Sequence, residues 1–394
     1  MGNVSLATDV IDFLRRFPPL HAALRSTFSA FLEFSRDTLR FYGRRSIRFG
    51  PPIGVFRLID DLLANSIEGR IILEAQEIPF GENGSVLKKT GWDLKLFYPW
   101  PIAWARIPYA RLVGPSLALI RGDKRLAVES VWNERCYRDD PSFTCLTLPP
   151  VTNLAGSWTS IVGRYCDAYF HWLTDALPRL ACLREFPPQT RILVPGNLRP
   201  YQRESLDLLG LSDRARPTPE KHLRLETYYF SGPTAMTGVH NPYAVNFLRQ
   251  SFLPHAVSRS RGARVFVWRE GKTRGIKNQA ELASFFQKRD WLVVDLEKLS
   301  LREQIGLFQE ANAICAAHGA ALTNLIWCNP GTKVLEIFSD RFLNPCYETI
   351  ARLVHLDHQY LILPGDSSFR VTVPIRLIEE QLDWLHENRA ANNR

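Results

Sequence analysis

The stretch that decides the fold runs from residue 313 to residue 338 and reads AICAAHGAALTNLIWCNPGTKVLEIF. An apolar run at Ala313–Ala317 precedes a predicted helix at Ala321–Trp327, and a second apolar run covers Val334–Phe338. Short apolar strands separated by helices are typical of a parallel sheet that is covered on both faces. His318 and Gly319 stand where the first strand gives way to the helix.

The same alternation extends to both sides of this stretch. Further strands are predicted at Ile192–Val194, Thr227–Phe230, Val265–Trp268, Trp291–Val294 and Tyr360–Leu363. Further helices are predicted at Tyr165–Arg184, Tyr201–Leu209, Tyr243–Phe252, Gln279–Gln287, Leu301–Gln309, Tyr347–Leu353 and Ile375–Glu387. Between Ile71 and Leu148 the pattern is short and β-like. The sequence therefore predicts an α/β protein with two Rossmann-like domains that face each other across a cleft.

Three segments follow from the changes in this pattern. Residues 1–70 are predicted to form a basic helical extension, interrupted at Pro residues. The Ser/Arg/Gly-rich run at 258–262 marks a boundary, so the two α/β domains are predicted at 71–257 and 258–394. The last helix is predicted either to stay on the second domain or to pack back on the first.

Composition points to a folded protein with an anionic partner but does not choose that partner. The 394 residues are 45% hydrophobic and 23% charged, and the formal net charge is +9. Much of the excess lies in residues 1–58, which hold nine Arg and four acidic residues among Phe and Tyr side chains. This segment is predicted either to pack on the body of the protein or to make peripheral contact with an anionic membrane.

Several protein classes are disfavoured by what the sequence lacks. The seven Cys form no CxxC pair, and no stretch resembles a signal peptide or a membrane span. A cytoplasmic protein is therefore predicted, with any membrane contact peripheral and at the inner face. There is no GxGxxG fingerprint or P-loop, which disfavours ordinary NAD or ATP enzymes. The basic residues form no recognisable nucleic-acid motif, so no specific nucleic-acid partner is predicted.

The first candidate site lies in residues 169–180, Tyr-Phe-His-Trp-Leu-Thr-Asp-Ala-Leu-Pro-Arg-Leu. On a regular helix His171, Asp175 and Arg179 share one face, opposite an apolar stripe. A His and an Asp one turn apart form an acid–base pair in which either group can accept a proton. A surface helix with its polar side in water also explains the spacing, although Trp172 is costly to leave in water.

The second candidate site is the turn at His318 and Gly319. Where a buried strand meets a helix, backbone N–H groups point outward at the positive end of the helix dipole, which suits a phosphate. Gly319 permits a ligand to approach closely. The alternative is a core histidine in a tight turn.

The third candidate site is the basic run that follows the predicted strand at 265–268. Arg269, Lys272, Arg274 and Lys277 stand where a diphosphate would lie, and Arg offers forked donors to phosphate oxygens. A solvated basic loop is the alternative. Glu336, inside an apolar strand, is either a group that grips a ribose or a partner in a core ion pair. No Asp-x-Asp pair stands alone at a strand end, so no metal site is predicted.

Taken together, these segments resemble glycosyltransferase family 61. The matching segments are aromatic-His-Trp-x-x-Asp-x-x-Pro-Arg-Leu at 169–180, the Arg-rich run from Arg269 and Arg274 to Asn278, Leu-Ser-x-x-Glu-Gln-x-x-x-Phe at 299–308, His-Gly-Ala-x-Leu-Thr-Asn at 318–324 and Pro-Gly-x-x-Val-Leu-Glu at 330–336. The resemblance covers about residues 110–365, and it departs from the family pattern at Gln279 and Ala321.

The resemblance implies a GT-B-like fold and transfer of a sugar with inversion, from a nucleotide-sugar donor to a glycan or polysaccharide acceptor. Residues 71–257 would face the acceptor and residues 258–394 would hold the donor. No cofactor is implied, because the nucleotide-sugar is a substrate. The alternative is a component of a polysaccharide assembly complex that binds a nucleotide-sugar without transferring it.

Spacing and resemblance together single out a set of site residues. They are Asp175, His171 and His318 for catalysis, Arg269, Arg274, Asn278, Gly319, Ala320, Thr323, Asn324 and Glu336 for the donor, and Trp172 and Arg179 for the acceptor. Asp175 is the predicted base and His171 its orienting partner, although these two roles are interchangeable on sequence grounds.

Overall fold

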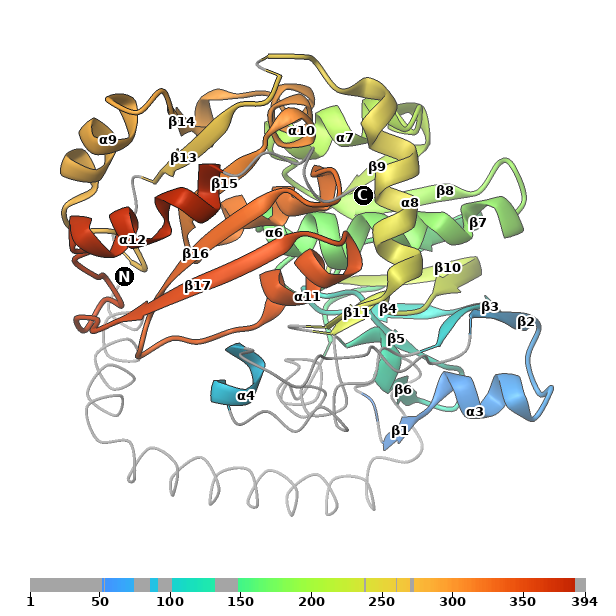
Figure 1. The fold of residues 1–394 in the computed structure, drawn as a ribbon. Helices are drawn as coiled ribbons and strands as arrows, with labels where there is room; N and C mark the ends of the chain where they lie inside the picture. The colour runs from blue at the N-terminus through green and yellow to red at the C-terminus, as the bar shows by residue number, and fades with distance from the viewer. Residues whose placement is uncertain are drawn as a thin grey trace, which may run out of the picture.

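The C-terminal half of the chain is built on a wholly parallel sheet (Figure 1). The structure is a computed structural model that describes residues 52, 54–73, 86–90, 101–131, 148–236, 239–259, 261–269 and 273–386. In the order β14-β13-β15-β16-β17, the strands are β14 Leu292–Asp295, β13 Arg264–Trp268, β15 Ala313–Ala317, β16 Lys333–Ser339 and β17 Asp357–Leu363. Every neighbouring pair is parallel. The strands predicted from the apolar runs of this half are all present.

The helices between these strands confirm the predicted alternation. They are α9 Gln279–Gln287, the short 3-10 helix η8 Leu296–Lys298, α10 Leu301–Glu310, α11 Cys346–Leu353 and the final α12 Ile375–His386. The predicted helix at 321–327 is a 3-10 helix, η9 Ala320–Trp327. At the start of α10 the Ser300 hydroxyl accepts a hydrogen bond from the Glu303 N–H, and the Glu303 carboxylate accepts one from the Ser300 N–H. This capping box explains part of the Leu-Ser-x-x-Glu motif.

The N-terminal half holds a ten-stranded mixed sheet. Its strands are β1 Gly54–Phe56, β2 Gly69–Leu73, β3 Ile102–Pro108, β4 Arg111–Val113, β5 Ala118–Ile120, β6 Arg125–Ala127, β7 Thr152–Ser160, β8 Arg191–Pro195, β9 Ala215–Thr218 and β10 His222–Ser231. The pairs β10–β7, β7–β8 and β8–β9 are parallel, whereas β3 and β4 pair with β10 antiparallel. The connections from β4 to β6 are too short for a crossover helix and therefore give antiparallel pairs. The fold is mixed α/β, and the two Rossmann-like domains stay a prediction.

This sheet begins inside the segment that was predicted as a helical extension. Strand β1 pairs with β6, and β2 pairs with β3. The helix α3 Leu58–Leu63 lies between β1 and β2 in the sequence. The carboxylate of buried Glu129 accepts a hydrogen bond of 3.1 Å from the N–H of Ile59 at the start of α3. A purely helical segment is therefore wrong for residues 54–70, and residues 1–51 and 53 lie outside the described residues.

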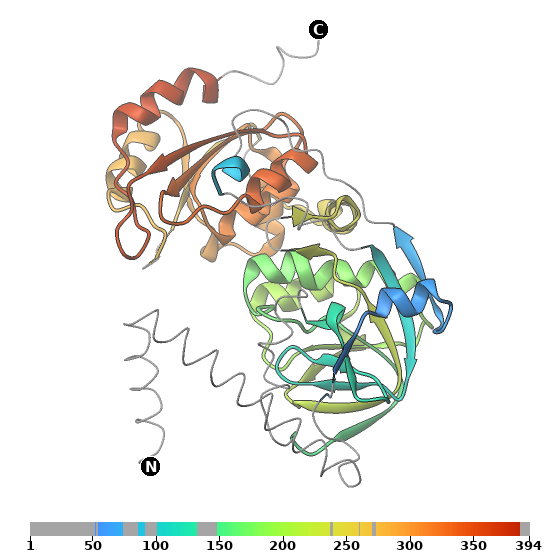
Figure 2. The same cartoon turned by 90° about the horizontal axis from the view of Figure 1, so that it is seen from below.

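A layer of helices lies between the two sheets, and Figure 2 shows α8 within it. The other elements of the N-terminal half are α4 Val86–Thr90, η2 Val128–Ser130, α6 Tyr169–His171, the π-helix η4 Trp172–Ala176, the 3-10 helix η5 Leu177–Glu185, α7 Pro200–Leu208, η6 Ser212–Arg214, the hairpin β11 Ala235–Met236 and β12 Val239–His240, α8 Pro242–Phe252 and η7 Leu253–His255. The continuous helical segment formed by α6, η4 and η5 is called the 169–185 helix below.

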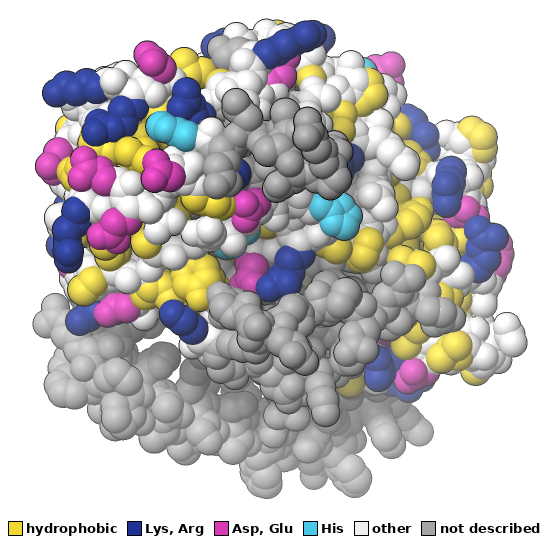
Figure 3. All heavy atoms as spheres, in the orientation of Figure 1, with side chains coloured by type: hydrophobic (Ala, Val, Ile, Leu, Met, Phe, Trp, Pro, Cys, Tyr) yellow, Lys and Arg dark blue, Asp and Glu magenta, His cyan; other side chains and the backbone are white. Residues whose placement is uncertain are grey.

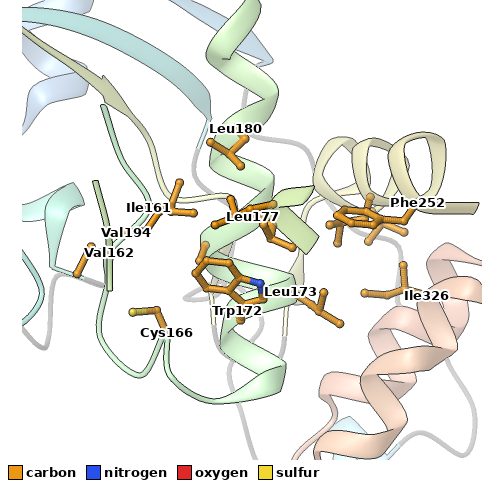
Figure 4. Close-up of a cluster of buried hydrophobic side chains, with 14 of the residues drawn as sticks. Ile161, Val162, Cys166, Trp172, Leu173, Leu177, Leu180, Val194, Phe252 and Ile326 are labelled. Carbon is orange, nitrogen blue, oxygen red and sulfur yellow. The ribbon is translucent and has the colours of Figure 1, made fainter. Parts of the chain in front are cut away.

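One hydrophobic core crosses the predicted boundary at 257/258. Leu173 and Leu177 of the 169–185 helix belong to the same buried cluster as Phe252 and Ile326 (Figure 4). The ring centroids of Phe252 and Trp327 lie 5.8 Å apart. The two halves are therefore packed against each other through apolar side chains, and the division into domains stays a prediction.

The final helix packs on its own sheet. Ile378 and Leu385 of α12 share a buried cluster with Phe266 and Trp291 of the C-terminal half. The alternative in which this helix returns to residues 71–257 is therefore wrong for its described residues.

Two further predictions concern the surface and the cysteines. None of the described helices is long and apolar enough to cross a membrane. Five of the seven Cys lie in the described residues, and all five are buried and form no disulfide with one another. On the face drawn in Figure 3, the described Lys and Arg side chains are interspersed with Asp and Glu rather than gathered in one basic patch.

Gly306 in α10 sets how closely that helix approaches the segment before β13. A Cβ at this position would lie 1.9 Å from the carbonyl oxygen of Val257. We predict that Gly306→Ala lowers the free energy of unfolding by about 1–3 kcal/mol, because backbone must move to admit the methyl group. Without this contact the better helix propensity of Ala would raise the stability by about 1 kcal/mol.

Urea denaturation measures this difference. The matched control is Gly122→Ala, since a Cβ at Gly122 would meet nothing within 4 Å. A Gly306→Ala variant that is as stable as the wild type, or more stable, contradicts the close approach of α10 to Val257.

Candidate active site

The first predicted pair forms a direct contact. His171 Nδ1 lies 2.6 Å from Asp175 Oδ2, and Asp175 Oδ1 accepts a hydrogen bond of 2.7 Å from the Thr174 hydroxyl. An ionised carboxylate only accepts hydrogen bonds, so Nδ1 carries the proton and Nε2 is the ring nitrogen that can accept one. The arrangement is that of an imidazole base oriented by a carboxylate. Both side chains are partly exposed, at 17% and 15%.

The helix that carries this pair is irregular. It begins as α6 after the extended backbone of Ala168, widens into a π-helix and continues as a 3-10 helix. Pro178, near the change from π to 3-10, has no N–H to donate, which interrupts the regular hydrogen-bond ladder. Turns of π-helix are frequent at functional sites. The predicted spacing on a regular helix is therefore altered, although His171 and Asp175 still meet.

Arg179, which was predicted for the acceptor, is buried beside Asp175. The two side chains line one small cavity together with Gly163, and Arg179 is 8% exposed. One of its terminal nitrogens lies 3.5 Å from the carbonyl oxygen of Val162, and its Nε has no hydrogen-bond partner among the described residues. Its role in binding an acceptor stays a prediction.

Trp172 was predicted to contact the acceptor, and this prediction is wrong. Its side chain is fully buried in the core shown in Figure 4. The indole N–H donates a hydrogen bond of 2.9 Å to the Ser205 hydroxyl of α7. Trp172 therefore anchors the 169–185 helix to α7 and has no surface for a ligand.

His318 is held by a buried network that ends at a second histidine. Its Nδ1 lies 2.6 Å from Glu336 Oε1, and His358 Nε2 lies 2.8 Å from Glu336 Oε2. Burial alone raises the pKa of Glu336, but the hydrogen bonds from the two imidazoles outweigh it and leave the pKa below its usual value. Both oxygens are occupied and the residue is fully buried, so the prediction that Glu336 grips a ribose is wrong.

His358 could not be identified from the sequence. It lies on β17, the strand beside β16, and its contact with Glu336 depends on the register of these two strands. The ring of His318 is stacked on Phe338, with centroids 4.8 Å apart. The network and this stacking fix the orientation of the His318 imidazole.

Arg269 and Gly319 meet at the turn after β15. Because β13 and β15 are parallel neighbours, Arg269 and His318 follow the same edge of the sheet. An Arg269 terminal nitrogen donates a hydrogen bond of 3.0 Å to the His318 carbonyl oxygen. A Cβ at Gly319 would lie 2.0 Å from that nitrogen, so Gly319 makes room for the guanidinium.

Arg274 adds a second cation at this turn. Its guanidinium lies 5.0 Å from the centroid of Phe342, whose ring contacts that of His318. Burial lowers the pKa of Arg269, and the nearby charge of Arg274 lowers it further. Neither guanidinium forms an ion pair with a carboxylate among the described residues. Two neighbouring cations without a carboxylate partner there can bind an anion such as a diphosphate.

Two of the residues predicted for the donor instead hold the fold together. The Asn324 carbonyl oxygen accepts hydrogen bonds from Tyr169 and Trp327, and its amide donates to Gln304. Asn278 exchanges hydrogen bonds with the backbone of Val373 in both directions. With both ends of each side chain engaged inside the protein, direct donor contact by these amides is not supported.

Ala320 and Thr323 are the remaining residues predicted for the donor. Both lie in η9, next to Gly319. Thr323 is fully buried, and its hydroxyl has no hydrogen-bond partner among the described residues. Donor contact by these two residues stays a prediction.

Aromatic side chains connect the two histidine motifs. The Phe170 ring lies 5.0 Å from the His171 ring and 5.8 Å from the Tyr347 ring, and the Tyr347 ring lies 5.1 Å from the His318 ring. The hydrogen bond of 2.7 Å from Tyr169 to Asn324 spans the same seam between the halves. The structure thus brings the His171–Asp175 pair and the His318 turn to one aromatic cluster. Tyr347 is a part of it that the sequence did not reveal.

No group of three or more His, Cys, Asp or Glu in the described part of the chain is arranged to hold a metal ion. Independence from a metal stays a prediction, because it concerns the reaction rather than these side chains alone.

Comparison with known proteins supports the resemblance given above. Residues 169–335 match the model of the family Glycosyltransferase 61. The rice (Oryza sativa subsp. japonica) protein Beta-1,2-xylosyltransferase RCN11 is 40% identical over 74 residues, which are 19% of this chain and 14% of that protein. The Arabidopsis thaliana Beta-1,2-xylosyltransferase is 32% identical over 84 residues, which are 21% of this chain and 16% of that protein. The matched segments therefore span less than a fifth of either relative.

The family match confirms the predicted resemblance over the part of the chain that carries the site. It begins at Tyr169, includes the His171–Asp175 pair, Arg269 and the His318 turn, and ends in β16. The predicted resemblance outside residues 169–335 is not covered by this match.

His240, which the sequence did not single out, lies against the same cluster. Its ring centroid is 5.6 Å from that of Phe170, and burial lowers its pKa from 6.5 to about 4. Between pH 4 and pH 6.5 the His240 imidazole is protonated in the unfolded chain but not in the folded protein. The free energy of unfolding therefore falls as the pH falls from 6.5 to 4. We predict that His240→Gln removes roughly 3 kcal/mol of this loss.

Urea denaturation at several pH values measures the effect. The control is His355→Gln, since His355 is exposed. A His240→Gln variant with the same loss of stability as the wild type contradicts a buried neutral imidazole.

The close approach of Arg269 to Gly319 gives a second prediction. A methyl group at Gly319 displaces the guanidinium, which breaks its hydrogen bond to the His318 carbonyl oxygen. We expect Gly319→Ala and Arg269→Ala each to weaken binding of inorganic pyrophosphate by roughly tenfold or more, as expected for a lost charge-assisted hydrogen bond.

Isothermal titration calorimetry with pyrophosphate measures the binding, and Gly122→Ala serves again as the control. Unchanged affinity in both variants means that this turn does not bind the anion.

Proposed function

We propose that this chain is an inverting glycosyltransferase that moves a sugar from a nucleotide-sugar to a glycan or polysaccharide acceptor. The family match and the two similar xylosyltransferases support a glycosyltransferase. The observation that carries the proposal is the aromatic cluster of Phe170 and Tyr347, which joins a proton acceptor from one half to a cationic turn from the other.

The chemistry assigned to the first half is proton removal. We assign the base to His171, because its Nδ1 contacts Asp175 and its Nε2 is the nitrogen that can accept a proton. The acceptor hydroxyl transfers its proton to Nε2, its oxygen attacks the anomeric carbon, and Asp175 stabilises the imidazolium that forms. A general base of this kind contributes about 10²–10⁴-fold. In this assignment Asp175 orients the base and does not itself take the proton.

The chemistry assigned to the second half is stabilisation of the leaving group. As the bond between the sugar and the diphosphate breaks, negative charge grows on the diphosphate oxygen. Arg269, Arg274 and the turn at His318 are the cationic and dipolar groups assigned to that charge. We propose that they act without a metal ion, and that the two halves form a GT-B-like arrangement with the nucleotide at the carboxyl edge of the parallel sheet.

The remaining proposals concern the location of the protein. The basic, aromatic composition of residues 1–58 supports peripheral contact with an anionic membrane, and a cytoplasmic site at its inner face is the matching location. Residues 1–51 and 53 lie outside the described part of the chain. The second candidate function, a binding component that does not transfer the sugar, is an outcome of the following test.

Replacing Asp175 tests the assignment. We predict that Asp175→Asn lowers the rate of sugar transfer by roughly 10²–10⁴-fold, because the amide no longer holds the imidazole in the productive tautomer. Donor binding is expected to persist, since Asp175 does not touch the cationic turn. The control is Asp213→Asn, which changes an exposed carboxylate.

The measurements are thermal stabilisation and transfer with UDP-, GDP-, CMP- and dTDP-sugars, each with and without EDTA. Normal transfer by Asp175→Asn rules out the acid–base assignment. Donor binding by the wild type without transfer or donor hydrolysis favours the binding component, and stabilisation that requires a divalent ion contradicts metal independence.

A further inference from the structure

A larger cavity opens beside the small one that Asp175 and Arg179 line. Its volume is about 430 Å³, within the range of small-molecule sites. It lies at the carboxyl edge of the parallel part of the N-terminal sheet, where Pro195 and Thr218, the last residues of β8 and β9, form part of its wall. The two cavities share Gly163 among their lining residues, so the larger one leads towards Asp175.

Tyr165 places an aromatic ring in this larger cavity. Its side chain is 49% exposed, and its ring centroid lies 5.5 Å from that of His171. Its φ of 64° is in the left-handed region, which residues other than glycine seldom adopt. Such a conformation is retained where surrounding structure holds it.

The loop that carries Tyr165 is anchored by α7. The Gln202 amide donates a hydrogen bond of 2.8 Å to the carbonyl oxygen of Cys166, and the Tyr201 hydroxyl donates one of 2.8 Å to that of Asp167. The N–H of Ala168 also donates to the carbonyl oxygen of Tyr165 at 2.9 Å. The ring is thus presented by a preformed loop, which reduces the entropy that a ligand must offset on binding.

Charges of both signs line the cavity in equal number. Arg164 and Lys221 are balanced by Asp167 and Glu220. The Arg216 guanidinium donates to the Glu220 carboxylate at 3.2 Å. Among the described residues, no ion pair within 4.0 Å involves Arg164, Asp167 or Lys221. Because Arg216 neutralises Glu220, the unpaired charges that the described residues place on the cavity wall are two cations and one carboxylate, which offer both donors and acceptors to the hydroxyls of a sugar.

We propose that this cavity binds a saccharide unit of the acceptor, with an apolar face of the sugar ring against Tyr165. This inference rests on the proposed function, since it places the acceptor of that reaction beside the proposed base. The contact of Tyr165 with His171 brings that sugar next to the proposed base. Tyr165 thereby takes the acceptor contact that the sequence suggested for the buried Trp172.

Saturation-transfer NMR with simple glycosides tests the proposal on the full chain without requiring turnover. The probes are methyl β-D-glucoside, methyl β-D-galactoside, methyl β-D-mannoside, methyl β-D-xyloside and, as the anionic comparison, methyl β-D-glucuronide. We expect at least one of these glycosides to bind the wild type. Tyr165→Ala should weaken this binding by roughly 3- to 10-fold, and Tyr165→Phe should retain it, because the ring makes the contact.

Tyr109 offers a closely matched control. It is also an exposed tyrosine, at 61%, its φ is 52°, and the guanidinium of Arg224 lies 5.1 Å from its ring centroid, much as Arg164 lies 5.2 Å from that of Tyr165. Tyr109→Ala should bind these glycosides like the wild type. Thermal unfolding of each variant identifies any loss of binding that is caused by unfolding alone.

Two results would overturn the proposal: no binding of any of these glycosides, or equal binding by Tyr165→Ala and the wild type. The glycoside measurement is independent of the donor. Donor binding and transfer that persist while the glycoside results fail would therefore reject this cavity and leave the proposed function intact. Glycoside binding without any donor binding would support this cavity and contradict the proposed transfer from a nucleotide-sugar.

Discussion

The structure depends on one helix, residues 169–185, whose apolar side chains are buried against both halves of the chain. The 169–185 helix packs Leu173 and Leu177 into a core that also contains Phe252 and Ile326, so that apolar contact joins the halves of the chain. Because burying such side chains contributes about 1.5–3 kcal/mol each, this seam is a strong constraint on the relative position of the halves. The same helix carries His171 and Asp175, and its packing therefore decides where the proton acceptor lies.

The seam also divides the chemistry between the halves. On one side an imidazole is oriented by a carboxylate, and on the other two guanidinium groups lie beside a turn whose histidine is fixed by Glu336. The aromatic rings of Phe170 and Tyr347, with centroids 5.8 Å apart, connect the two groups. A displacement reaction needs both kinds of group at once, one to remove a proton and one to receive negative charge.

Several motif residues turned out to build the scaffold. Trp172 is a core side chain, Asn324 ties the two halves together, and Ser300 with Glu303 caps a helix. These residue types are suited to ligand binding and also to satisfying buried polar groups, and a motif alone does not distinguish these uses. Exposure and hydrogen-bond partners made the distinction, and the proposed reaction is therefore assigned to His171, Asp175, Arg269 and the turn at His318.

By itself the sequence determined the elements of the C-terminal half, since apolar runs of strand length and amphipathic helices are local patterns that a parallel sheet requires. It also determined the His171–Asp175 contact, because two residues four positions apart on one helix are neighbours wherever the helix lies. The tertiary structure alone decided the contacts between distant segments. The pairing of Glu336 with His358, the contact of Tyr347 with Phe170 and the burial of Trp172 depend on strand register and on packing between the halves, and these are long-range properties that no local spacing encodes.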